Sequence, residues 1–197
     1  MKFVNTSFAW FSLMVLLWPF AAMAQIDTGP DGLGIYFDTD ATVVSTTAAA
    51  GDFVEAYLIA TNLTQSGEIG LWAAGMCPDG WSADIDGTPT HGGFNYSMNM
   101  PGDPCWSCLT FGFDPPLPVG NIVILATLNI QVYEDLEPIY LNLRSEGCYY
   151  QTFDGGDEEF PFYPSSGSSD LPVATINGVA PVAVENLELD SIKAMYR

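Results

Sequence analysis

The chain has 197 residues, of which 48% are hydrophobic, and its 24 acidic residues face only four basic ones, for a formal net charge of −20. Charge of this sign repels phosphate backbones and anionic lipid surfaces, so it argues against nucleic acids and membrane surfaces as partners. The length suits a single domain with a sizeable core.

The N-terminus is typical of an export signal. Lys2 precedes an apolar run over residues 8–20, and the sequence Ala-Met-Ala at 22–24 is a small-x-small cleavage site. The run is too short for a stable anchor, and no later stretch is long enough to span a bilayer. We therefore expect a secreted or cell-surface protein, periplasmic or extracellular. It divides into a signal peptide over 1–24, a domain over 25–180 and a tail over 181–197.

Downstream of the signal, the hydrophobic pattern predicts roughly nine to eleven short strands, which is typical of a two-sheet antiparallel β-sandwich. The Pro-rich segment 114–118 is interpreted as a break between two of them. No helix longer than about ten residues is predicted before the tail. The predicted strands are 33–38, 42–46, 53–61, 68–76, 81–86, 94–100, 105–113, 121–133, 139–143, 148–153 and 171–179.

Segment 53–61 carries apolar residues on both of its faces, which predicts a strand that is central in its sheet or covered on both sides. Segment 121–133 is the longest predicted strand. Its even-numbered residues from Ile122 to Val132 are all apolar, so a period of two places them on the core face. Its odd-numbered residues are apolar at first and polar from Thr127 on, so the second face should be buried at one end and wet at the other.

Four cysteines in an exported chain predict disulfides. The Cys-Trp-Ser-Cys segment also fits a redox pair, but no βαβ pattern surrounds it. Zinc bound by all four thiols agrees with the count but not with the spacing of a zinc ribbon. Three pairings are open, and we favour the one that joins Cys105 to Cys108 and Cys77 to Cys148.

Paired carboxylates suggest calcium sites. Asp38 and Asp40 lie two residues apart, as do Asp84 and Asp86, and calcium prefers clustered oxygen ligands in loops. The simpler interpretation of each pair is that of turn aspartates on a solvated surface. Calcium is therefore a candidate ligand and no other cofactor is expected.

Glycan binding and catalysis have weaker signals. Trp81 follows a Pro-Asp-Gly turn and is the best candidate for an exposed ring that stacks on a sugar, although large aromatics mostly fill cores. The single histidine, His91, lies in a loop without a cysteine or serine motif to serve. No catalytic residue is predicted, and we expect that the protein is not an enzyme.

The segment 187–197 predicts a short amphipathic helix. Its acidic residues come first and its basic residues, Lys193 and Arg197, come last, which suits the helix dipole. Its apolar stripe includes Ile192, Met195 and Tyr196. A helix this short needs a partner surface, which is either the sandwich itself or another molecule that uses the segment as a docking or sorting tail.

The order of strand motifs resembles cohesin-like modules of the carbohydrate-binding superfamily of β-sandwiches. The resemblance covers about residues 33–180, except for the cysteine-containing region 77–108. The whole chain also resembles uncharacterised exported bacterial proteins with a tail similar to SIKAMYR. The motifs that resemble cohesins are Gly51-Asp52-Phe53-Val54 opening the strand through residue 62, the segments 120–132 and 139–143, and the ending 163–178.

The resemblance implies a non-catalytic module that works in extracellular assembly or adhesion, and it transfers no binding residue to this chain. We therefore expect a protein partner or self-association, through exposed edge strands and the tail. Polysaccharide binding, in a module that calcium could stabilise, is the alternative.

Overall fold

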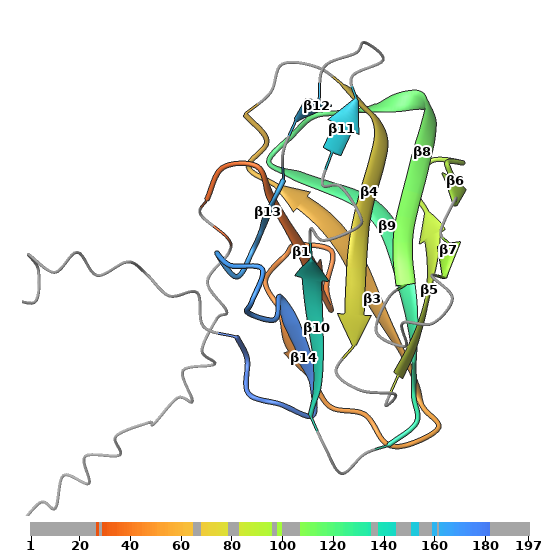
Figure 1. Ribbon diagram of the computed structural model, residues 1–197, viewed down its shortest axis with the longest axis vertical. Helices are drawn as coiled ribbons and strands as arrows, with labels where there is room; N and C mark the ends of the chain where they lie inside the picture. The colour runs from red at the N-terminus through yellow and green to blue at the C-terminus, as the bar shows by residue number, and fades with distance from the viewer. Residues whose placement is uncertain are drawn as a thin grey trace, which may run out of the picture.

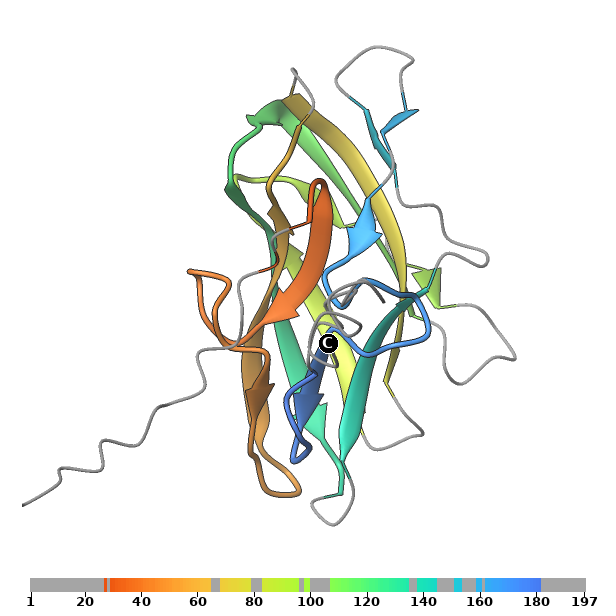
Figure 2. The ribbon, with the colours of Figure 1, turned by 90° about the vertical axis from the view of Figure 1, so that its left-hand side faces the viewer.

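The computed structural model is a two-layer β-sandwich (Figure 1). Turned by 90°, the same ribbon shows β1 and β3 (orange to brown) in one layer and β4 and β10 (yellow and teal) in the other (Figure 2). Backbone alone is described for residues 68–69, 71–78, 98–99, 107–110, 144, 151–153 and 159–160. The structure describes residues 27, 29–64, 68–78, 83–95, 98–99, 107–134, 138–144, 151–153, 159–160 and 162–181.

The first sheet has the strand order β13-β1-β3-β9-β5, and the second has β12-β11-β4-β10-β14-β2, with β8 beside β4 and with β6 and β7 beside β8. Neighbouring strands are antiparallel except for the short pairs β1–β13 and β14–β2. The strands are β1 Gly32–Tyr36, β2 Ser45–Thr46, β3 Phe53–Thr61, β4 Glu68–Pro78, β5 Ala83–Pro89, β6 Phe94–Asn95, β7 Met98–Asn99, β8 Ser107–Pro118, β9 Ile122–Val132, β10 Ile139–Arg144, β11 Gln151–Phe153, β12 Glu159–Phe160, β13 Tyr163–Pro164 and β14 Ala174–Ile176.

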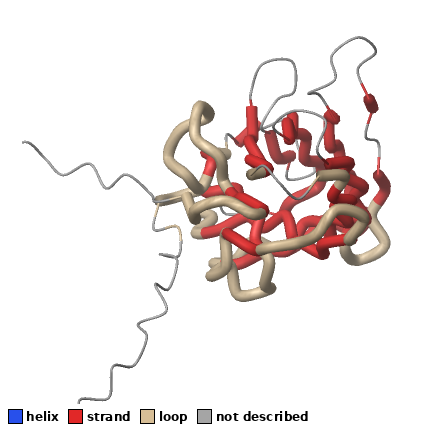
Figure 3. The backbone as a smooth tube through the Cα atoms, turned by 90° about the horizontal axis from the view of Figure 1, so that it is seen from below, coloured by secondary structure: helices blue, strands red, loops and turns tan. Residues whose placement is uncertain are grey.

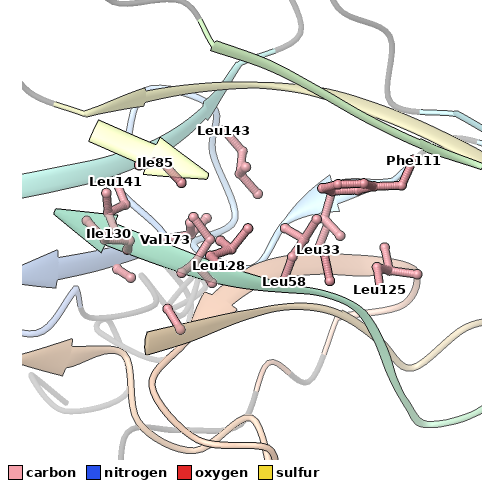
Figure 4. Packing of buried hydrophobic residues seen from close by; sticks show 14 of the residues in the cluster. Leu33, Leu58, Ile85, Phe111, Leu125, Leu128, Ile130, Leu141, Leu143 and Val173 are labelled. Atoms are coloured by element: carbon pink, nitrogen blue, oxygen red, sulfur yellow. The ribbon is translucent and has the colours of Figure 1, made fainter. Parts of the chain in front are cut away.

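The main core lies between the two sheets, where side chains from both layers interdigitate (Figure 4). Leu58 and Leu128 reach it from the first sheet, and Leu141 and Phe111 reach it from the second. Gly87 of β5 faces Phe111, and a Cβ at this position would lie 2.7 Å from the edge of that ring. The glycine therefore allows the aromatic ring to pack close to the backbone of the opposite sheet.

Strand β9 confirms the predicted long strand, but its first residues do not point to the side that was predicted. Its register with β3 shifts between Leu58 and Ile59, where Leu125 is left without a partner on β3. The extra residue of this bulge reverses the alternation. After it, even-numbered residues such as Leu128 enter the core as predicted. Up to the bulge, the odd-numbered Val123 and Leu125 face the core instead, and Ile122 is 43% exposed. The prediction that Ile122 and Ile124 face the main core is therefore wrong.

The Pro-rich segment is also different from its prediction. Strand β8 continues through Asp114 to Pro118 instead of ending at residue 113. The pairing between β4 and β8 shifts register between Ile69 and Leu71, so Pro115 and Pro116 lie where no partner on β4 is in register. Proline lacks a backbone N–H, so a strand tolerates it at a position where the neighbouring strand requires no hydrogen bond.

Two predicted strands are seen only in part. Within the predicted strand 94–100 the structure describes the short strands β6 and β7, and residues 96, 97 and 100 lie outside the described part. Bends on either side reduce the predicted strand 171–179 to β14. Strand β3 has the predicted bounds and lies between β1 and β9, as its two apolar faces indicated. The described part of the chain is built from strands and loops without a helix (Figure 3), and within it no helix could cross a membrane.

Replacing Leu128 by Ala should lower the free energy of unfolding by about 2–5 kcal/mol, because Leu128 is completely buried and its loss leaves a cavity. Asn129 is the matched control: it is next in the strand, on the exposed face, and Asn129→Ala should change stability by no more than about 0.5 kcal/mol. Urea unfolding measures both. Equal losses for the two variants would contradict the assignment of faces after the bulge.

Candidate interaction face

The outer surface of the first sheet carries three aligned rows of side chains from β3, β9 and β5. Each row runs across the three strands, as the register of the two pairings defines. We call these nine residues the acidic face. The rows are Phe53–Gln131–Asp84, Glu55–Asn129–Asp86 and Tyr57–Thr127–Thr88.

The acidic face combines an aromatic ring, amides and carboxylates at the surface. Phe53 is 62% exposed, and Glu55, Asn129 and both aspartates of β5 are exposed as well. The Tyr57 hydroxyl donates a 2.5 Å hydrogen bond to Oε1 of Glu55. This hydrogen bond raises the pKa of Tyr57, because the neighbouring carboxylate disfavours the ionised phenol. The arrangement offers planar groups and hydrogen-bond acceptors at the surface.

The chain has few basic side chains that could neutralise the carboxylates of the acidic face. The chain has four basic residues, and Arg144 is the one that lies in the described part, at the end of β10 in the other sheet. Asp84 and Asp86 are about 7 Å apart along β5, and Glu55 and Asp86 are two strands apart, at about 10 Å. Both separations are near the screening length of about 8 Å in physiological salt, so a cation placed here would relieve repulsion.

Next to the Tyr57 row, a second apolar cluster covers the outer surface of the same sheet. It consists of Tyr36, Ala41, Val44 and Ile59, and Tyr57, Ile124 and Ala180 pack against it. The loop between β1 and β2 supplies two of its members. The described chain therefore ends, at residues 180–181, beside the acidic face.

The first described residues are held to the same sheet by polar contacts. The Asp27 carboxylate accepts hydrogen bonds from the Gly29 amide at 2.9 Å and from the Thr61 hydroxyl at 3.0 Å, and the Asn62 side chain donates to the carbonyls of Asp27 and Gly29. Burial raises the pKa of Asp27, and the hydrogen bonds from Gly29 and Thr61 to its carboxylate oppose the shift. Asp31 accepts two further bonds from Thr64. These contacts hold the first described residues against the first sheet.

Tyr36 has a buried hydroxyl that makes no hydrogen bond of ordinary geometry, although the hydroxyls of Ser165 and Thr61 lie near it. Burial is the main cause that raises the pKa of Tyr36 to about 12; Ser165 and Thr61 oppose this shift, and the charges of Asp27 and Asp38 add to it. A buried hydroxyl without a partner costs free energy that its apolar isostere would not cost.

Asp38, one of the predicted calcium ligands, closes a turn. Its carboxylate accepts hydrogen bonds from the Thr42 amide at 2.9 Å, the Val43 amide at 3.1 Å and the Thr42 hydroxyl. Burial raises the pKa of this carboxyl, but the hydrogen bonds together outweigh burial and lower the pKa below its ordinary value of 3.8. Asp38 thus has the role of a turn aspartate, which was one of the two interpretations of the sequence; the other was a calcium ligand.

The described residues contain no cluster of three or more side chains of the metal-binding types His, Cys, Asp and Glu. Asp40 is an exposed neighbour in the same loop as Asp38. Asp84 and Asp86 point to the same side of β5 and join the acidic face instead of forming a loop site. Calcium at these positions stays a prediction.

The structure places the remaining candidate residues as follows. His91 is exposed at a turn with a φ of 54°, and no role follows from its position. The backbones of Cys77 and Cys108 lie on the neighbouring strands β4 and β8. Both disulfides stay predictions. Cys105, Cys148, Trp81, Ile192, Met195 and Tyr196 lie outside the described residues, as does segment 1–24.

Sequence reasoning missed Phe53, Glu55 and Asn129 as surface neighbours of the aspartates. The alternation of each strand was visible in the sequence, but the register between strands was not. Only the pairing of β3 and β5 with β9 brings these residues into common rows.

Solved structures with a similar fold include cohesin modules. The sixth cohesin of Acetivibrio cellulolyticus scaffoldin B, solved with a Cel5 dockerin, has a TM-score of 0.54 and 9% identity, over 76% of this chain and 99% of that one. A type II cohesin domain from the cellulosome of Acetivibrio cellulolyticus has a TM-score of 0.51 and 12% identity, over 80% of this chain and 100% of that one. No protein-family model and no curated protein matches the sequence. The predicted cohesin-like fold is confirmed.

Replacing Tyr36 by Phe should raise the free energy of unfolding by about 1 kcal/mol, because the change removes a buried hydroxyl without a partner. The matched control is Tyr57→Phe, which removes an exposed hydroxyl and should change stability by about 0.5 kcal/mol or less. Chemical denaturation gives both values. A loss of stability in Tyr36→Phe would show that the hydroxyl has a partner in solution.

Replacing Asp38 by Ala should lower the free energy of unfolding at pH 7 by about 0.5–1.5 kcal/mol, since the turn loses its acceptor. A folded pKa below 3.8 means that the wild-type advantage is complete above pH 3.8 and disappears as the pH falls through the folded pKa. Thermal unfolding of the wild type and of Asp38→Ala over a range of pH, with and without a chelator, measures this difference in stability. A difference that disappears on chelation at pH 7 would mean that Asp38 acts through calcium instead.

Proposed function

We propose that this chain is an exported, non-catalytic β-sandwich module that binds a protein partner in an extracellular or cell-surface assembly. The observation that carries the proposal is an exposed sheet face with aromatic, amide and acidic side chains on a cohesin-like fold. One of the cohesins with a similar fold was solved in complex with a Cel5 dockerin.

The chemistry of the face favours a protein partner with basic groups. A large exposed ring such as Phe53 supplies the apolar anchor that protein interfaces use at their centre. The carboxylates of Glu55, Asp84 and Asp86 supply charge that directs a basic partner and accelerates its association. Export is inferred from the N-terminal signal pattern, and it brings the face into contact with partners outside the cytoplasm.

Polysaccharide binding is the second candidate. The amides of Asn129 and Gln131 and the rings of Phe53, Tyr57 and Tyr133 lie on or next to the same face. Flat rings beside amide and carboxylate groups can stack on sugars and hydrogen-bond their hydroxyls. Calcium would then act as a stabilising ion rather than as a catalytic one.

Replacing Phe53 by Ala should weaken capture of the native protein partner by roughly tenfold or more, because the truncation removes the aromatic anchor of the face. The bait is the purified chain, and the readout is the partner retained from the native secretome, measured over a dilution series. Tyr163→Ala is the matched control, since Tyr163 is 55% exposed but lies on β13 at the opposite edge of the sheet.

Equal capture by wild type and by both variants would contradict the role of this face. Affinity electrophoresis on a panel of polysaccharides decides between the two candidates. We expect unchanged migration in every gel. Retardation that Phe53→Ala abolishes would replace the protein-binding proposal by the polysaccharide one.

A further inference from the structure

We propose that the acidic face is occupied by the chain's own C-terminal segment, with the cationic end 191–197 lying over β3, β9 and β5. The proposal rests on the face that carries the proposed function and names its first occupant. Charge, reach and apolar character each point to this segment.

The charge argument begins with the supply of cations. Of the four basic residues in the chain, two are Lys193 and Arg197, and the seven residues from Ser191 to Arg197 contain no acidic residue. Glu55, Asp84 and Asp86 lie together on a face that carries no basic side chain. Within this chain, the end of the tail is therefore the densest positive complement to that face.

The reach argument begins at Ala180, which packs against the second apolar cluster together with Tyr57. Rows of the acidic face are about 7 Å apart along the strands, so its far row lies about 14 Å beyond Tyr57. Lys193 follows Ala180 by thirteen positions, that is, thirteen steps along the backbone. They span about 20 Å as a helix and more than about 40 Å when extended, so the segment can reach each row in either form.

Apolar character provides the third argument. At helical spacing, Ile192 and Tyr196 lie on one side of the segment, and Lys193 and Arg197 lie on the adjacent side. This pattern matches a surface on which Phe53 and Tyr57 stand beside carboxylates. A segment tethered next to its site has an effective concentration in the millimolar range, which favours docking within one molecule over docking on a second copy.

A docked tail would compete with a protein partner for the acidic face. Binding of that partner would then require displacement of the tail, and variants that release the tail should bind more tightly. This consequence depends on the proposed function, whereas docking of the tail does not.

The experiment is two-dimensional NMR with heteronuclear relaxation on the full secreted chain, in the absence of any partner. In the wild type, we expect the amide signals of residues 191–197 to be ordered and shifted from random-coil positions. The double variant Asp84→Asn/Asp86→Asn should move these signals to random-coil positions. The variant Asp170→Asn, which removes one exposed carboxylate outside the face, should leave them unchanged. Added salt should act like the double variant.

Tail signals at random-coil positions in the wild type, or signals that the double variant does not move, would overturn the proposal. Ordered signals that appear only as protein concentration rises would also overturn it, because the tail would then lie on a second copy. Since no partner is present, these results do not depend on partner capture, and failure of the capture experiment would leave them unaffected.

Discussion

The structure depends on how β9 pairs with β3 on one side and β5 on the other. Its residues after the bulge alternate between a completely buried set, which includes Leu128 and Ile130, and an outward set, which includes Asn129 and Gln131. A shift of one residue in either pairing would move the whole apolar set to solvent, so burial of the first set fixes the position of the second. The acidic face is therefore held in place by the core beneath it.

The bulge gives the outer surface two different ends. On one side of it, Ile59 and Ile124 face outward and are covered by the loop between β1 and β2. On the other side, the outward residues are polar or charged except for Phe53, and most of them are exposed. One continuous sheet therefore has an apolar end next to a charged end. This surface suits a peptide segment that is anchored at the apolar end and bound through charge at the other end.

Much of this fold could be predicted from the sequence, because alternation is a local property. The bounds of β3 and the central part of β9 follow directly from it. The outward orientation of Ile122 and Ile124 could not be predicted in this way. It results from a bulge, which depends on the pairing with β3 and cannot be recognised in the alternation of one segment. The continuation of β8 through its prolines was missed for a related reason, because it depends on the local register with β4. The candidate site was predicted only in the aspartates of β5. Their neighbours come from strands about 30 and 45 residues away in the sequence, and only tertiary pairing brings them together.

Hydroxyl-radical footprinting of the chain with its captured partner tests most directly whether the acidic face binds protein. The chain should carry Lys193→Glu and Arg197→Glu, so that its own tail does not compete for the face. We predict that the partner lowers oxidation of Phe53 and Tyr57 and leaves Tyr163 unchanged. Protection of Tyr163, with Phe53 and Tyr57 as reactive as in the unbound chain, would contradict the account.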